Sequence, residues 1–145
     1  MLDAIAIYEK GLADLSELDG VERLVFMLQD FDNLMDMEGW DHFFLHESHF
    51  AWYPEMKDWL HTIGDTASLA VLTDYEAYLK ERLVRLSPSE IERFLSFQDN
   101  ASMNAAPDWR HQYSELKAAR WAKALAYLES QDVGLSTAEG SAPPG

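Results

Sequence analysis

The sequence predicts an all-α fold: a single compact bundle of six or seven helices with a long C-terminal helix. Apolar residues recur at spacings of three and four along most of the chain, which is the periodicity of helices and not of strands. The clearest row runs from Leu69 to Leu86, and Ser87-Pro88 then has the character of a new helix start. With 145 residues, the chain is long enough for one domain with its own core.

Three helices are expected in the first 50 residues. The first covers residues 2–15, and the second begins after Asp19-Gly20 and ends near Gly39. A core-facing row of apolar residues marks the second helix: Val21, Leu24, Leu28, Phe31 and Met35. A short, aromatic-rich helix follows within residues 38–50.

Two helices are expected between residues 54 and 86. Pro54 stands at the start of one of them, and Gly64 is a typical residue for its C-terminal end. The other extends from Thr66 to Leu86. Its apolar row is expected to face the core and consists of Leu69, Leu72, Tyr75, Leu79, Leu83 and Leu86.

Two more helices are expected in the C-terminal part of the chain. The first is capped by Ser87 and ends near Gln98, and the long final helix covers residues 108–130. The polar segment 99–107 between them is expected to be a loop, because it is rich in Asn, Asp and Ser and ends in proline.

The folded domain is expected to end before the C-terminus. Residues 131–145 finish with the sequence GLSTAEGSAPPG, whose Gly, Ser and Pro content is typical of a flexible tail. The domain is therefore assigned to residues 1–130. Five large side chains of this domain are expected in the core: Phe43, Phe44, Leu72, Leu79 and Trp121.

The composition excludes several classes of protein. Hydrophobic residues make up 48% and aromatic residues 12%, which is too much for a disordered acidic chain. The absence of cysteine excludes disulfides, cysteine-based zinc sites and a cysteine nucleophile, and it fits a reducing cytoplasm. The start MLDAIAIYEK lacks the basic and apolar regions of a signal peptide, and no apolar run approaches the roughly 18 residues of a membrane span. A cytoplasmic protein without membrane contact is expected.

The net charge of −15 is concentrated in the N-terminal half of the chain. Residues 1–79 contain 17 Asp and Glu against three Lys and Arg, whereas residues 80–145 contain nine acids and eight bases. A chain with this charge repels nucleic acid and anionic lipid, so electrostatic attraction selects basic partners. The alternative interpretation is that the acidity serves solubility alone.

Three histidines form the cluster that most resembles a metal site. His42 and His46 are four residues apart and can chelate one ion from a helix, but the sequence H-F-F-L-H lacks the glutamate of the HExxH zinc motif. On a continuous helix His42 and His49 would lie about 10 Å apart, so all three are not expected to reach one ion. Further ligands would have to come from Glu38, Glu47 or His61. The prediction is that the chain has no metal site and no cofactor, with His42 and His46 as the weak metal candidates, and that the histidines pack within an aromatic cluster.

No motif of a known catalytic site is present. The sequence contains no GxSxG, P-loop or GxGxxG. Its five tryptophans are consistent with a base-stacking platform for nucleic acid. Such platforms also need a basic groove, however, which the acidic half of the chain does not supply. The tryptophans are expected to pack in the core or an interface, and a metal-dependent or small-molecule enzyme is the least favoured class.

One ten-residue segment, MEGWDHFFLH at residues 37–46, resembles a motif of a bacterial domain family that includes DNA-mimic proteins. The family motif is Asn-Gly-Gly-Phe, any residue, Gln-Phe-Phe, any residue, Asn. Three residues match it outright: Gly39, Phe43 and Phe44. Trp40 takes the place of the first aromatic residue, and His42 and His46 stand at the Gln and Asn positions.

The resemblance extends beyond this motif. Ile63-Gly64 is similar to the Ile-Gly-Ala that follows in the family, and the whole similarity covers about residues 15–130. It implies an all-helical fold and, in the characterised branch of the family, an acidic dimer that occupies a DNA-binding protein in place of DNA.

The expected function is therefore that of an acidic protein-binding protein, a DNA mimic that occupies a basic, DNA-binding partner and does not itself bind nucleic acid. A homodimer is expected as well. The carboxylates expected to meet the partner are Asp19, Glu22, Asp30, Asp32, Asp36, Glu38 and Asp41. Five of them fall within 12 residues, which on a helix gives about one charge per 3.3 Å, close to the spacing along one DNA strand. The alternative is an inhibitor or immunity-type protein whose partner is unrelated to DNA.

Overall fold

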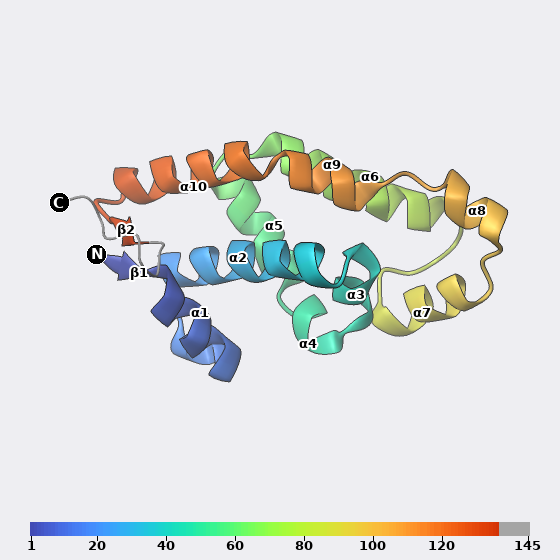
Figure 1. Cartoon of the computed structure of the whole chain (residues 1–145), viewed down its shortest axis with the longest axis horizontal. Coiled ribbons are helices and arrows are strands. Elements are labelled where there is room, and N and C mark those ends of the chain that lie inside the picture. Colours follow the sequence, from blue (N-terminus) through green and yellow to red (C-terminus); the bar gives the residue numbers. More distant parts are fainter. Residues whose placement is uncertain (137–145) are drawn as a thin grey trace.

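The computed structural model describes residues 1–136 and confirms the all-α class predicted from the sequence. This part of the chain contains ten α-helices, a short 3₁₀ helix (η1) and two very short strands (Figure 1). In chain order the elements are β1 (Leu2–Asp3), α1 (Ala4–Ala13), η1 (Leu15–Glu17), α2 (Val21–Met37), α3 (Trp40–Leu45), α4 (Glu47–Phe50), α5 (Tyr53–Thr62), α6 (Thr66–Glu81), α7 (Pro88–Ser96), α8 (Asn100–Ala105), α9 (Trp109–Glu115), α10 (Lys117–Ser130) and β2 (Leu135–Ser136).

The helices outnumber the expected six or seven because some expected segments are subdivided. The aromatic segment contains both α3 and α4, and the long final helix is divided at Leu116 into α9 and α10. The prediction that residues 99–107 form a loop is wrong, since α8 lies within them. The carboxylate of Asp99 accepts a hydrogen bond from the backbone N–H of Ser102 at 2.7 Å, and this N-terminal cap allows a polar segment to form a helical turn.

The helix expected to reach Leu86 ends earlier, at Glu81. The chain turns at Leu83, whose backbone adopts a left-handed φ of 60°. The N–H groups of Leu83 and of the residue after it donate to carbonyls in the last turn of α6, a closure that usually uses glycine. Leu83 is consequently 91% exposed and does not occupy the core position expected for it.

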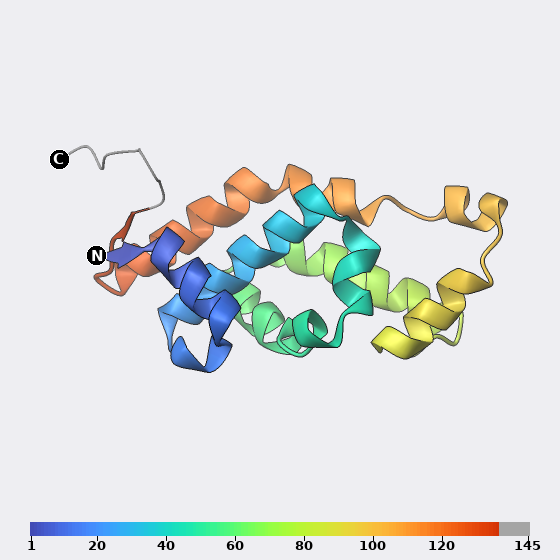
Figure 2. The same ribbon diagram turned by 60° about the horizontal axis from the view of Figure 1, so that its bottom comes forward.

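α2 is the central helix of the fold. It contacts α1, α3, α5, α9 and α10, and Figure 1 shows α9 and α10 along one side of it and α1 along the other. Its apolar row faces the core as predicted, with Leu24, Leu28 and Phe31 fully buried. α6 packs against α5 and α9, while α7 and α8 form the end of the molecule opposite the two termini (Figure 2).

Aromatic side chains fill the core where α3 meets α2, α5 and α6. Four of the five predicted core residues are buried there or nearby: Phe43, Phe44, Leu72 and Leu79. The fifth, Trp121, is only half-buried. Its indole ring packs against the core from α10, and its N–H group donates to Asp32, so it lies at the edge of the core and not in its centre.

The two ends of the described chain lie side by side. β1 and β2 pair in parallel, with Leu2 opposite Leu135 and Asp3 opposite Ser136. Residues 134–136, which belong to the expected tail, therefore pack beside the N-terminus. Residues 137–145 of that tail lie outside the described residues.

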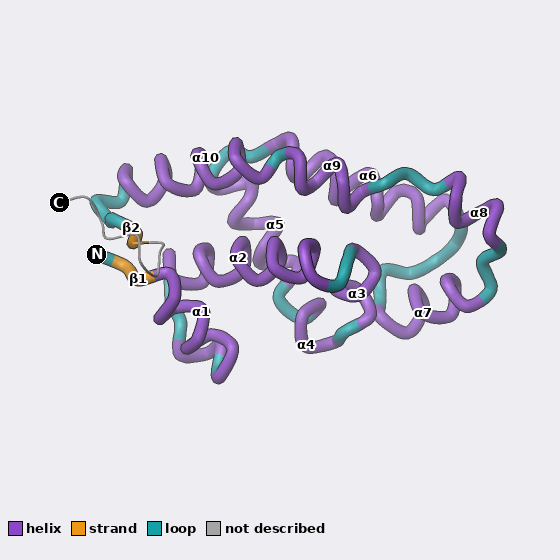
Figure 3. The backbone as a smooth tube through the Cα atoms, viewed as in Figure 1, coloured by secondary structure: helices purple, strands orange, loops and turns teal. Residues whose placement is uncertain are grey.

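The helices are short and joined by turns and loops, as Figure 3 shows. The longest is α2, with 17 residues, and it carries several acidic residues. Across residues 1–136, no helix combines the length and the apolar character that crossing a bilayer would require.

Candidate protein-binding surface

Asp30 was expected on the surface, and this prediction is wrong. Its side chain is buried against α1, where the carboxylate accepts a hydrogen bond from the Tyr8 hydroxyl at 2.9 Å. The ring of His49 lies 4.0 Å away on α4. Burial raises the pKa of the Asp30 carboxyl, and the hydrogen bond from Tyr8 opposes this shift. Asp30 therefore belongs to an internal contact and does not face a partner.

Asp32 is also buried, which contradicts the expectation that it presents its charge to a partner. Its carboxylate accepts hydrogen bonds from the Arg120 guanidinium at 2.8 Å and from the Trp121 indole at 2.7 Å. The fully buried Arg120 also donates to the Ser68 hydroxyl and to the Tyr113 carbonyl. This network joins α2 to α6, α9 and α10, so Asp32 serves the fold.

The other five candidate carboxylates remain accessible, but they lie near opposite ends of α2. Near the start of α2 is the α1–α2 corner, defined by Asp14, Glu17, Asp19 and Glu22. At the end of α2 is the α2–α3 corner, defined by Asp36, Glu38 and Asp41. The 17 residues of α2 separate the two corners by about 25 Å. The exposed acids thus form two patches and not the continuous strip that the sequence suggested.

The α1–α2 corner keeps most of its negative charge. The nearby base, Arg23, forms a two-pronged ion pair with Glu55, at 2.8 and 2.9 Å, and also donates to the backbone carbonyl of Leu15. Asp14 caps η1 by accepting from Ser16, and this hydrogen bond lowers the pKa of the Asp14 carboxyl. Because Arg23 is already paired, the corner is open to an external cation.

The α2–α3 corner is built by a sharp turn at Gly39. Its φ of 98° lies in the region that favours glycine, and it allows α3 to begin with only two residues between it and the end of α2. The turn places Asp36 and Glu38 just before it and Asp41 just after it. This gives the family motif a physical role, because the glycine permits the turn that sends Phe43 into the core.

Bases partly compensate the α2–α3 corner. Lys117 lies 3.7 Å from the Asp36 carboxylate, and Arg110 donates to the Asp36 backbone carbonyl at 3.2 Å. Glu38 contacts the ring of His42. Asp41 differs from Asp36 and Glu38, since its side chain makes no ion pair and no hydrogen bond with any residue of 1–136.

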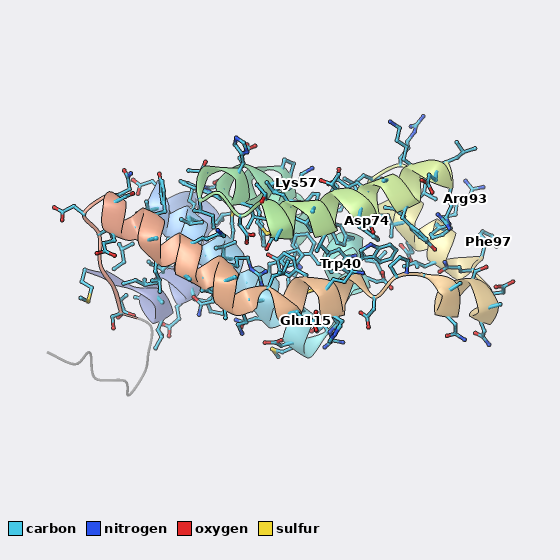
Figure 4. The ribbon with its side chains drawn as sticks, turned by 90° about the horizontal axis from the view of Figure 1, so that it is seen from above. Trp40, Lys57, Asp74, Arg93, Phe97 and Glu115 are labelled. Carbon is cyan, nitrogen blue, oxygen red and sulfur yellow. The ribbon has the colours of Figure 1, made fainter. Side chains whose placement is uncertain are left out.

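A cavity of about 180 Å³ opens beside Asp41, between α3, α6, α7 and α9. Five aromatic side chains contribute to its lining: Trp40, Tyr75, Tyr78, Phe94 and Trp109. Figure 4 shows Trp40 between α6 and α9, with Asp74 on the α6 side. No sequence signal indicated this cavity, because its walls come from segments that are far apart along the chain.

A family comparison bears directly on this surface. Residues 16–131 match the DMP19-like protein family. The chain belongs to that family. It is the DNA-mimic family that the Gly-aromatic motif resembles, and the matched range agrees with the 15–130 expected from the sequence. No curated protein and no solved structure matches the chain.

The histidine cluster of this DMP19-like protein is tighter than the sequence suggested. The helix breaks at His46, between α3 and α4, so the rings of His42 and His49 lie 6.4 Å apart and not 10 Å. Even so, no group of three or more His, Asp or Glu side chains within residues 1–136 is arranged to hold a metal ion. His49 stacks on Phe43, and burial lowers the pKa of the His49 ring while the charge of Asp30 opposes that shift.

An apolar surface at the far end of the molecule was also missed. This surface, the α6–α8 end, consists of the exposed side chains of Leu83, Phe97 and Met103. Arg82 and Arg93 line the groove beside them, and Figure 4 shows Arg93 and Phe97 at this end. The sequence pattern hid this surface because it assigned Leu83 to the core-facing row of a longer helix.

Proposed function

We propose that this DMP19-like protein is an acidic protein-binding DNA mimic, which occupies a basic, DNA-binding protein in the cytoplasm. The observation that carries the proposal is its membership in the DMP19-like family together with accessible carboxylates at both ends of α2. The partner's cationic DNA-binding surface would meet the α1–α2 corner and the α2–α3 corner at the same time.

The charge density supports this proposal. The two corners hold seven carboxylates over the roughly 25 Å length of α2. A single strand of duplex DNA presents about seven phosphates over the same length. Since the carboxylates are grouped in two patches, the partner is expected to contact two separated sets of phosphate-binding residues.

Salt dependence and a matched pair of variants test the proposal. The purified chain captures basic proteins from a lysate of the native host. The binding of each captured protein to the chain is then measured at about 50 and 300 mM salt, together with the ability of the chain to displace DNA from it. Changing Glu17, Asp19 and Glu22 together to the corresponding amides should weaken binding several-fold. The control variant makes the same charge change at three exposed acids outside both corners: Glu81, Glu92 and Glu129.

The two triple variants separate a specific surface from general acidity. Screening acts over about 8–10 Å near physiological ionic strength, so binding through exposed carboxylates should weaken steeply with salt. Equal binding by both variants, or binding that is indifferent to salt, would rule out the α1–α2 corner as a DNA-like surface.

The α6–α8 end favours a second candidate, an interaction protein of the inhibitor or immunity type with an apolar interface. Leu83 and Phe97 are 91% and 82% exposed, which is unusual for such large apolar side chains. A complex made there should tolerate salt and be lost in Phe97→Asp. Light scattering of the wild type and of Phe97→Asp tests whether a second copy covers this end in the homodimer that the resemblance implies: a dimer that the substitution makes monomeric would support it.

A further inference from the structure

We propose that the aromatic cavity beside Asp41 receives an arginine side chain of the basic partner. This inference rests on the proposed function, because it names the group by which that partner is held. The site would be a specific anchor within a contact that is otherwise set by charge.

The walls of the cavity suit a planar cation. The rings of Tyr75 and Trp109 lie 4.9 Å apart at 70°, and those of Tyr78 and Trp109 lie 4.7 Å apart at 67°. The ring faces that line the cavity are electron-rich and attract cations, and one face of Tyr78 already carries the guanidinium of Arg82. The Trp109 indole donates to Asp74 at 3.1 Å, which fixes the orientation of this wall.

The charge of the cavity matches a cation. Asp41 lines the cavity and has no counter-ion among residues 1–136. The apolar surroundings raise the pKa of the Asp41 carboxyl, and its charge adds to the effect of burial in raising the pKa of the Tyr75 hydroxyl, so the two groups lie close enough to interact. An entering cation would supply the missing partner of Asp41. Arg110 also lines the cavity, and its guanidinium donates to the backbone carbonyl of Asp36.

Arginine fits this site better than lysine or a nucleobase. The protein stacks its own guanidinium groups on tyrosine rings twice, with Arg82 3.6 Å from the centre of the Tyr78 ring and Arg120 3.7 Å from that of Tyr113. A guanidinium is planar, stacks on aromatic rings and binds a carboxylate with two parallel hydrogen bonds, which an ammonium cannot do. The cavity has room for several water molecules or the end of one long side chain. The acidity of the chain disfavours a nucleotide.

The test uses the full chain without its partner. ¹⁵N-labelled protein is titrated with N-acetyl-arginine amide while the indole N–H signal of Trp109 is followed by NMR. A saturable shift is expected, whereas the uncharged analogue N-acetyl-citrulline amide should produce none. Asp41→Asn should weaken arginine binding about fivefold, the size of one partly exposed ion pair. Asp36→Asn, at an exposed acid of the same corner, is the matched control and should bind as the wild type does.

Unchanged dispersion of the backbone amide signals shows that each variant is folded. The inference is overturned if citrulline amide binds as well as arginine amide, or if Asp36→Asn weakens binding as much as Asp41→Asn. A chain that ignores the arginine probe but still binds its partner in a salt-dependent way would overturn this inference alone. A chain that binds the probe while partner binding ignores salt would support the cavity and overturn the DNA-mimic proposal.

Discussion

Replacing Arg120 by Met should cause a large loss of stability. Arg120 is fully buried and donates to Asp32, to the Ser68 hydroxyl and to the Tyr113 carbonyl. Met fills a similar volume but leaves the buried Asp32 carboxylate with only the indole N–H of Trp121 as a donor. Removing one partner of a buried ion pair costs about 3–5 kcal/mol, because the remaining charge stays out of water. For a chain of this length, the melting temperature should fall by about 10–15 °C.

Urea unfolding followed by far-ultraviolet circular dichroism measures this loss. Lys117→Met, at an exposed base of the same helix, should change the unfolding free energy by no more than about 0.5 kcal/mol. Adding Asp32→Asn to Arg120→Met removes the unpaired buried charge and should restore part of the stability. In the double-mutant cycle, the double variant should therefore lose less unfolding free energy than the sum of the two single losses. A loss below about 1 kcal/mol in Arg120→Met would refute the view that this pair holds α2 against α10.

Two further predictions concern local features of the fold. Leu83→Gly should stabilise the protein by about 0.5–1 kcal/mol in urea unfolding, because glycine adopts the left-handed conformation at the end of α6 without strain; a loss of stability would contradict this. Burial lowers the pKa of the folded-state His49 ring, so the unfolded chain binds more protons and stability should fall as the pH drops below about 6.5. Melting temperatures of the wild type and His49→Gln between pH 7.5 and 5.5 check this: the variant should lose less on acidification, and equal losses would contradict the assignment.

The all-α class and most helices could be predicted from the sequence because they depend on local patterns. The Ser87 cap and the Gly64 stop lie where the sequence placed them, since both use side-chain chemistry that acts within a few residues. The early end of α6 could not be predicted, because leucine gives no signal for a left-handed turn. Asp99 is a typical N-cap residue and could have predicted the start of α8, but the polar composition of the segment led to the prediction of a loop.

The burial of two acids carried a signal that charge counting ignored. Asp32 lies four residues after Leu28 and three before Met35, so the helical period alone places it on the core-facing side of α2. Its partner Arg120 is 88 residues away, and no local pattern shows that the two meet. The position of Asp32 was therefore predictable from the sequence, whereas the ion pair that makes its burial tolerable required the tertiary structure.

This distinction decides how the DNA-mimic proposal has to be tested. The run of acidic residues in the sequence suggests neutralising Asp30, Asp32 and Asp36 together as the test. The carboxylates of Asp30 and Asp32, however, accept hydrogen bonds inside the fold. Asp32→Asn alone should lower the unfolding free energy, and any loss of binding in the triple variant would then follow the unfolded fraction and not the surface charge. Variants confined to accessible acids, such as Glu17 and Asp19, leave the core intact. Only such variants connect a loss of binding to the charge that the partner would meet.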